Sequence, residues 1–158
     1  MPVWRPTARL ILMDPGQRVL LFGGQDPRGR FWLTPGGGVH RGETLTQAAV
    51  RELAEETGVA VGEADLGPVV ATSSGLWAAD GVQFFGADSF FLVRTGDAVI
   101  DTSGQEELER SIISEHRWWT AAEIDTSPDY ILPRGLAGLL ETLLRDGVPE
   151  RPVRLPWR

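Results

Sequence analysis

Three glutamates stand close together in the sequence, at Glu52, Glu55 and Glu56. On an α-helix, the i, i+3 and i+4 spacing would gather their carboxylates on one patch, about 100° wide. Like charges at these spacings destabilise a helix by about 0.2–0.5 kcal/mol per pair, and Arg51 can offset only part of that repulsion. Divalent cations such as Mg²⁺ or Mn²⁺ bind such oxygen ligands. The pattern therefore indicates a metal site, with a solvated acidic helix face as the alternative.

A helix of about four turns is predicted from Thr44 to Thr57, and it would carry the three glutamates. Thr44 followed by Gln47 is the capping-box pattern, and Gly58 suits the left-handed position after a helix. The apolar residues fall on one broad side of this helix: Leu45, Ala49, Val50 and Leu53. We expect that side to pack against a sheet, and the glutamates lie about a third of a turn away from it.

The remaining elements predict an α/β or α+β domain with a mixed sheet. Strands are expected over residues 7–13, 18–22, 31–33, 66–77, 83–94 and 116–119. Loops are expected over residues 23–30, 35–38 and 95–109. A helical turn at residues 121–123 and a closing helix at residues 133–145, with Pro133 as its first residue, complete the pattern. We expect one domain over residues 1–158, with residues 149–158 as an extended tail.

The composition excludes several kinds of chemistry. All 15 basic residues are arginine, and the 158 residues include no lysine, cysteine or asparagine. Without lysine there is no Walker-type phosphate loop, and without cysteine there is no disulfide or thiolate nucleophile. The net charge of −7 argues against a nucleic-acid polymer as partner. The apolar run near the start is too short for a signal peptide or a membrane span, so we expect a cytoplasmic protein that binds no membrane.

The surroundings of the three glutamates form a longer motif. Residues 37–59 fit the pattern G-x5-E-x7-R-E-U-x-E-E-x-G-U, where U is an aliphatic residue. Every fixed place is filled, by Gly37, Glu43, Arg51, Glu52, Leu53, Glu55, Glu56, Gly58 and Val59. The motif resembles a complete Nudix box of the Nudix (MutT-like) hydrolases. The strands and the helix around it extend the resemblance over most of the chain.

The resemblance implies a Nudix-type α/β/α sandwich with a mixed β-sheet between helices. It also implies a pyrophosphohydrolase, a hydrolase of phosphoric anhydride bonds, that cleaves a nucleoside diphosphate linked to another group. A metal-activated water would attack phosphorus. The ligands of Mg²⁺ or Mn²⁺ would be one carbonyl and three carboxylates, those of Gly36, Glu52, Glu55 and Glu56. Arg51 and Glu43 would orient these ligands from behind.

The general base stays open at this point. In the family it is a glutamate of the box, here Glu52, or one from a later segment. Glu115, just before the expected strand at residues 116–119, is the first choice outside the box. The other candidates are Glu106, Glu107 and Glu109. For each of these, a surface glutamate is the alternative.

Contacts to the substrate would come from arginines and aromatic side chains. Phosphate or base contacts are expected from Arg28, Arg30 and Arg41, and base stacking from Trp32 and Trp77. Solvated arginines and buried aromatics are the alternatives. Pro68 is too close to the box for the ADP-ribose branch, and Trp77 stands near the place of a tyrosine common in the dinucleoside polyphosphate branch. The missing cysteines and asparagines argue against the zinc-bearing NADH branch and the oxidised-guanine branch.

A different class of function is a Nudix-fold module that senses or binds a nucleotide without cleaving it. Such modules usually have a degraded box or an attached DNA-binding domain, and the sequence shows neither. The expected partner is therefore a nucleotide-like small molecule that serves as substrate. The closing helix and the aromatic strand are a candidate face for a homodimer.

Overall fold

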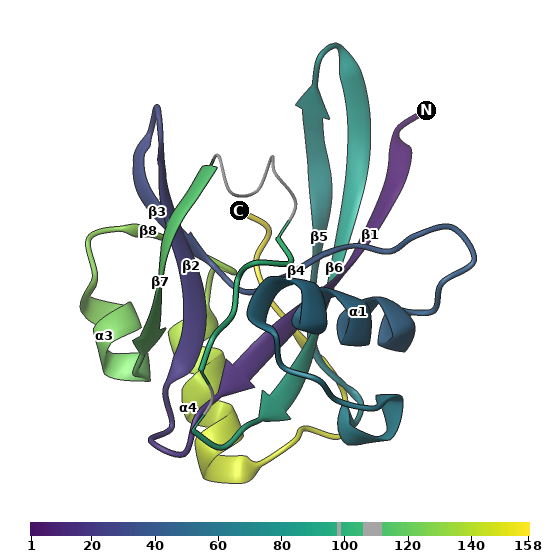
Figure 1. Cartoon of the computed structure of the whole chain (residues 1–158). Helices are drawn as coiled ribbons and strands as arrows, with labels where there is room; N and C mark the ends of the chain where they lie inside the picture. Colours follow the sequence, from purple (N-terminus) through teal and green to yellow (C-terminus); the bar gives the residue numbers. More distant parts are fainter. Residues whose placement is uncertain (98, 106–111) are drawn as a thin grey trace.

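A mixed sheet is the centre of the computed structural model, which describes residues 1–97, 99–105 and 112–158. The strands are β1 (Val3–Met13), β2 (Val19–Asp26), β3 (Gly29–Leu33), β4 (Gly36–Gly38), β5 (Val69–Ala79), β6 (Val82–Arg94), β7 (Ile113–Trp119), β8 (Tyr130–Leu132) and β9 (Val153–Arg154). The helices are α1 (Leu45–Thr57), α3 (Ala121–Thr126) and α4 (Leu136–Asp146), with a 3₁₀ turn at Glu63–Asp65. The strand order is β8-β3-β2-β1-β6-β5-β9, while β4 pairs with β1 and β7 with β2 (Figure 1).

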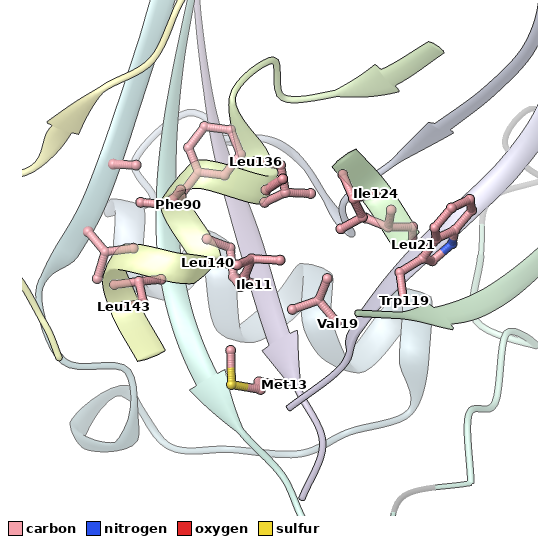
Figure 2. Close-up of a cluster of buried hydrophobic side chains, with 14 of the residues drawn as sticks. Ile11, Met13, Val19, Leu21, Phe90, Trp119, Ile124, Leu136, Leu140 and Leu143 are labelled. Atoms are coloured by element: carbon pink, nitrogen blue, oxygen red, sulfur yellow. The ribbon is translucent and has the colours of Figure 1, made fainter. Parts of the chain in front are cut away.

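Two apolar clusters, one on each face of the sheet, hold the helices in place. Side chains alternate along β1, so that Leu10 and Leu12 join the cluster with α1. Ile11 and Met13 point the other way, into the cluster that Leu140 of α4 helps to form (Figure 2). Helices therefore lie on both faces of a mixed sheet (Figure 1), and the predicted α/β/α sandwich is confirmed.

Helix α1 begins and ends where the sequence predicts. The Thr44 hydroxyl accepts a hydrogen bond from the Gln47 N–H at 3.1 Å, and the Gln47 side chain accepts one from the Thr44 N–H at 3.0 Å. Gly58 closes the helix with a φ of 76°, in the left-handed region. Leu53 and Ala49 are fully buried against the sheet. This packing sets the rotation of α1 and turns its glutamate side toward β4.

The strand β2 is longer than predicted, because Gly23 and Gly24 belong to it and not to a loop. Aromatic rings of β3 cover both glycines. A Cβ atom at Gly23 would lie 2.6 Å from the ring of Trp32, and one at Gly24 would lie 2.7 Å from the ring of Phe31. The prediction of a loop at Gly23 and Gly24 is therefore wrong, whereas the predicted turn at Pro27 and Arg28 is confirmed, since the chain turns between Asp26 and Gly29.

The ends of several other elements also differ from the prediction. Helix α4 begins at Leu136 and not at Pro133, because Gly135 precedes it with a φ of 83°, outside the helical region. The strands β4, β8 and β9 have two or three residues each, too few to show a periodicity in the sequence. Within the expected tail, β9 pairs with β5 and Leu155 is buried. Among the described residues, no helix is long and apolar enough to cross a membrane.

We expect Leu140→Ala to lower the free energy of unfolding by about 2–5 kcal/mol, because Leu140 is 1% exposed and its loss leaves a cavity between α4 and the sheet. Urea denaturation followed by circular dichroism measures the change. Glu141→Ala, at an exposed position of the same helix, is the control. Equal effects of the two substitutions would contradict the packing described for α4.

Candidate active site

Arg51 of α1 joins three carboxylates in one network. Its Nε and Nη2 atoms donate to the two oxygens of Glu43 at 2.8 and 2.9 Å. Its Nη1 atom donates to Oε1 of Glu52 at 2.9 Å and to Oε2 of Glu55 at 3.3 Å. The Gly38 carbonyl accepts a further bond from Nη2 at 2.9 Å. A guanidinium presents five N–H groups in a fixed plane, so this one side chain ties the loop before α1 to the helix.

Glu43 is held in its charged form by this network. The hydrogen bonds from Arg51, and after them the backbone N–H of His40, lower the pKa of Glu43 from 4.5 to about 2. The hydrogen bond to Glu43 in turn raises the pKa of Arg51, against the opposing effect of burial. The pair therefore stays ionised across the physiological range.

The three glutamates of the predicted metal site differ in exposure and in partners. Glu52 and Glu56 are 6% and 5% exposed, whereas the Glu55 side chain is 39% exposed. The backbone N–H of Gly36 donates to Oε2 of Glu56 at 2.8 Å. A Cβ atom at Gly37 would lie 2.8 Å from the carboxylate carbon of Glu52. The glycines of β4 thus let the backbone come close to the acidic side of α1.

The donors gathered there suit a hard divalent cation. Glu52 Oε1 and Glu55 Oε2 already converge on one cationic atom, Nη1 of Arg51, and carboxylate oxygens are the ligands that Mg²⁺ and Mn²⁺ prefer. As the side chains stand, no three acidic or histidine residues of the described ranges are arranged to hold a metal ion. Metal binding would therefore need some of these carboxylates to change their side-chain conformation.

Gly36 connects this cluster to the sheet and to Arg9, a residue that the sequence reasoning missed. Gly36 pairs with Arg9 across β4 and β1, and its carbonyl accepts a hydrogen bond from Nη1 of Arg9 at 3.1 Å. The Gly36 φ of 136° is one that residues with a Cβ rarely adopt. The signal for Arg9 was its place in the alternating polar series Arg5, Thr7 and Arg9, which marks one face of β1.

Glu115, the candidate base outside the box, is bound to an arginine other than Arg51. It stands in β7 and forms an ion pair with Arg30 at 2.5 Å. Among the described residues, no hydrogen bond or ion pair joins it to the three glutamates of α1. The candidates Glu106, Glu107 and Glu109 lie outside the described residues.

The arginines and tryptophans predicted to contact substrate are dispersed. Arg28 sits on the β2–β3 turn, where it pairs with Asp26, and Arg41 is exposed in the loop before α1. Trp32 is 2% exposed and donates to Asp129 at 2.9 Å, so its ring is part of the core. Trp77 is 38% exposed and stacks on Phe84 at 4.3 Å between ring centroids. The structure does not bring these residues together around the glutamates.

Two cavities meet beside the glutamate cluster, and Arg9 and Leu33 line both of them. The first has a volume of about 260 Å³ and includes Gly36 and Glu56 in its lining. The second has a volume of about 230 Å³, and Asp88 lies in its wall. A molecule that extends from one cavity to the other would pass the predicted metal ligands.

Replacing Glu43 by Gln should destabilise the protein in a pH-dependent way. The folded pKa of Glu43, about 2, lies below the ordinary value of 4.5, so its charge stabilises the fold above pH 4.5. That contribution is lost as the pH falls toward 2. In urea unfolding at several pH values, the gap in stability between wild type and Glu43→Gln should therefore shrink with acidification. Glu150→Gln, at an exposed site outside the network, is the control. A gap that does not change with pH would contradict the role given to Arg51.

Comparison with known proteins places this geometry in a family. The model of the NUDIX domain matches residues 3–137. The RNA pyrophosphohydrolase of Sphingopyxis alaskensis is 38% identical over 63 residues, which are 40% of each chain. The enzyme of the same name from Erythrobacter litoralis is 37% identical over 118 residues, which are 65% of each chain. The chain thus spans about two fifths to two thirds of the length of these curated relatives.

Solved structures show the same fold. The E. coli ORF135 protein superposes with a TM-score of 0.62 at 23% identity, over 95% of this chain and 96% of that chain. At this identity the likeness shows the fold alone. The family model covers far more than half of the residues, among them the whole motif from Gly37 to Val59. The chain belongs to the NUDIX domain family, and the resemblance of its glutamate motif to a Nudix box is confirmed.

Proposed function

We propose that the chain is a divalent-metal-dependent pyrophosphohydrolase that cleaves a nucleoside diphosphate linked to another group. The observation that carries the proposal is the network in which Arg51 binds Glu43, Glu52 and Glu55. Helix α1 carries this network, and the third glutamate of the predicted metal site, Glu56, accepts a hydrogen bond from the β4 backbone. The two curated relatives named above support the proposal, because each is called an RNA pyrophosphohydrolase.

Each residue of the network has a part in this proposal. When bound, Mg²⁺ or Mn²⁺ would lower the pKa of a water molecule and neutralise charge on the phosphoryl oxygens. The side chains of Glu52, Glu55 and Glu56 and the carbonyl of Gly36 would hold the ion. Arg51 keeps the glutamates on one side of the helix, and Glu43 balances its charge. These contacts keep the carboxylates close together in the absence of a metal ion.

For the general base, we favour Glu52 over Glu115. Glu52 is buried beside the β4 glycines and within the carboxylate cluster. Glu115 is tied to Arg30, and its side chain is 46% exposed. A base must lie within hydrogen-bond reach of the proton that it takes, and Glu52 is the one of the two that lies in the cluster.

The partner of the site would be a nucleotide-derived small molecule. We keep the cytoplasm as the proposed location. The leucines of the closing helix are buried in the core of one chain and cannot form the expected homodimer face: Leu136, Leu139, Leu140 and Leu143. A homodimer would have to use other residues.

Substitution of the proposed ligands should abolish hydrolysis. We expect Glu55→Gln and Glu56→Gln to lower kcat by more than about 100-fold, because a neutral amide binds Mg²⁺ far less well than a carboxylate does. The assay measures release of phosphate or nucleotide from nucleoside diphosphate derivatives and 5′-triphosphorylated RNA, with Mg²⁺ or Mn²⁺. Glu141→Gln, exposed on α4, is the matched control. Unchanged turnover in both ligand variants would refute the metal-site assignment.

The same assay separates the enzyme from a nucleotide sensor. Nucleotide binding by the wild type in the presence of Mg²⁺, with no product from any compound of the panel, would favour a non-catalytic binding module.

A comparison of two further variants tests the choice of base. We expect Glu52→Gln to reduce kcat at least about 10-fold more than Glu115→Gln does, because proton transfer by a positioned side chain contributes about 10²–10⁴-fold. Single-turnover measurements from pH 6 to 9, at saturating metal, compare the two. A larger loss of kcat in Glu115→Gln than in Glu52→Gln would assign the role of general base to Glu115 of β7.

A further inference from the structure

Apolar side chains are exposed where β1, β5 and β6 project from the rest of the sheet. Among the described residues, ten large apolar side chains are exposed, and six of them lie in these strands or next to them: Met1, Val3, Trp4, Leu76, Trp77 and Val82. In Figure 1 the β5–β6 hairpin extends well past α1, with the start of β1 beside it. Neither apolar cluster of the core includes any of the six. So much exposed apolar surface in one place favours contact with another molecule.

The outer edge of β5 is only partly paired. Strand β9 pairs with Ala71 and Thr72 alone, and the Thr72 carbonyl accepts a hydrogen bond from the Leu155 N–H at 2.8 Å. Alternate residues of a strand direct their N–H and C=O groups to the same edge, and the pairing of β5 with β6 runs without a shift from Ala71 onward. The residues that point outward like Thr72 are therefore Ser74, Leu76 and Ala78. Among the described residues, no strand pairs with their outward backbone groups.

The open part of this edge, residues 73–79, lacks the features that protect the edges of sheets. Exposed edge strands usually carry a charge, a proline or a bulge that prevents pairing with another chain. Residues 73–79 contain no charged residue and no proline. The irregularity of β5 lies at its other end, between Val69 and Ala71. The edge is therefore open to a further strand.

A second copy of the same chain suits this edge. Two identical strands that pair antiparallel are related by a twofold axis, so the contact closes after two copies. In such a pair the segment faces itself, and any charge within it would lie close to a like charge. The chain carries a net charge of −7, but residues 73–79 carry none of it. Self-pairing at this edge therefore brings no like charges directly together.

The register of the pair follows from the covering of Gly75. The indole of Trp157 lies on this glycine, on the face of the sheet that Trp77 shares, because alternate residues of a strand point to the same face. If Leu76 stood opposite its own copy, Trp77 of the second chain would fall on Gly75 and collide with Trp157. If Trp77 stands opposite its own copy, the residue that faces Gly75 is Ala79, which is small.

Charges at the two ends of the contact are complementary in this register. Asp80 directly follows β5, and Arg154 lies in β9. Neither forms an ion pair within the described part of the chain. Asp80 of one copy would stand opposite Ser74 of the other, two residues along β5 from Thr72, which is the partner of Arg154. Each end of the contact thus brings an aspartate of one copy toward an arginine of the other.

We propose that two copies of the chain pair through the outer edges of β5, antiparallel and with Trp77 opposite Trp77. The two sheets then continue into one another, and Leu76 of each copy exchanges backbone hydrogen bonds with Ala78 of the other. The two exposed Trp77 rings, each stacked on Phe84 of its own chain at 4.3 Å between ring centroids, meet on one face. The pairing does not depend on the hydrolysis proposed above, since none of these residues belongs to the predicted metal site.

Sedimentation velocity of the full chain tests the pairing. We expect the wild type to sediment as two chains at high concentration and to dissociate on dilution. Ala78→Pro should raise the dissociation constant of the pair about 10-fold or more, because both copies lose an outward N–H that the ladder with β6 does not use. Leu76→Arg should also weaken the pair. Val82→Arg, exposed on the same hairpin but not on its outer edge, is the matched control. Circular dichroism confirms that each variant is folded.

A disulfide tests the register. The chain has no cysteine, so Trp77→Cys introduces the only thiol. Residues opposite each other at a position without ladder hydrogen bonds have Cα atoms about 4.5 Å apart, within the range of a disulfide. We therefore expect Trp77→Cys to form a covalent pair with a mild oxidant, whereas Gln83→Cys, exposed on β6, should stay free. Faster cross-linking of Leu76→Cys than of Trp77→Cys would overturn the register.

A wild type that stays monomeric up to about 1 mM would overturn the proposal. So would a pair that Ala78→Pro and Leu76→Arg leave as stable as that of the wild type, since the copies would then meet elsewhere. Growth into assemblies of more than two chains would contradict the closed twofold contact. Binding to phosphatidylcholine vesicles without any self-association would assign the exposed apolar side chains to a lipid surface and refute the pair.

Discussion

Negative charge gathered on one side of α1 is the constraint on which the rest of the site depends. Buried carboxylates are costly unless a cation or hydrogen-bond donors meet them. Arg51 supplies the cation for Glu43, Glu52 and Glu55, and the backbone of Gly36 supplies a donor for Glu56. The helix can hold this arrangement because its opposite side is anchored in the apolar core, so the cost of crowded charge is offset by packing elsewhere.

Close approach of the backbone is the second requirement. Glu52 and Glu56 face the glycine strand β4. A side chain at Gly36 would collide with the backbone of β1, and one at Gly37 would collide with the carboxylate of Glu52. The same strand pairs with β1 at Arg9. Strand β4 therefore contacts both the acidic helix and the centre of the sheet, and through Arg9 it is connected to the two cavities. A change in the backbone of β4 would alter the geometry of all of them.

Local patterns predicted the fold class and the helix that carries the glutamates, and the metal-site residues stay a prediction. Features that depend on contacts between distant parts of the sequence could not be predicted. About twenty consecutive residues contain the capping box of α1, its apolar side and the glutamate motif. The structure has the helix where these patterns predict it. Gly23 has no side chain that would indicate a strand, so the sequence predicts a loop there. The ring that packs against it belongs to Trp32 of the next strand. Arg9 and Trp157 meet at one cavity although they lie at opposite ends of the sequence. No spacing rule in a single sequence reveals such a pair.

The packing of Trp157 against Gly75 and Gly86 also has a consequence for the order in which parts of the molecule can fold during synthesis. Helix α1 and its partner strands β1, β4 and β6 are encoded within the first 94 residues, and they can associate as soon as that length has left the ribosome. Trp157, which covers Gly75 and Gly86, is synthesised after all of these elements. The acidic helix and its strands can therefore form before the part of the cavity wall that Trp157 supplies.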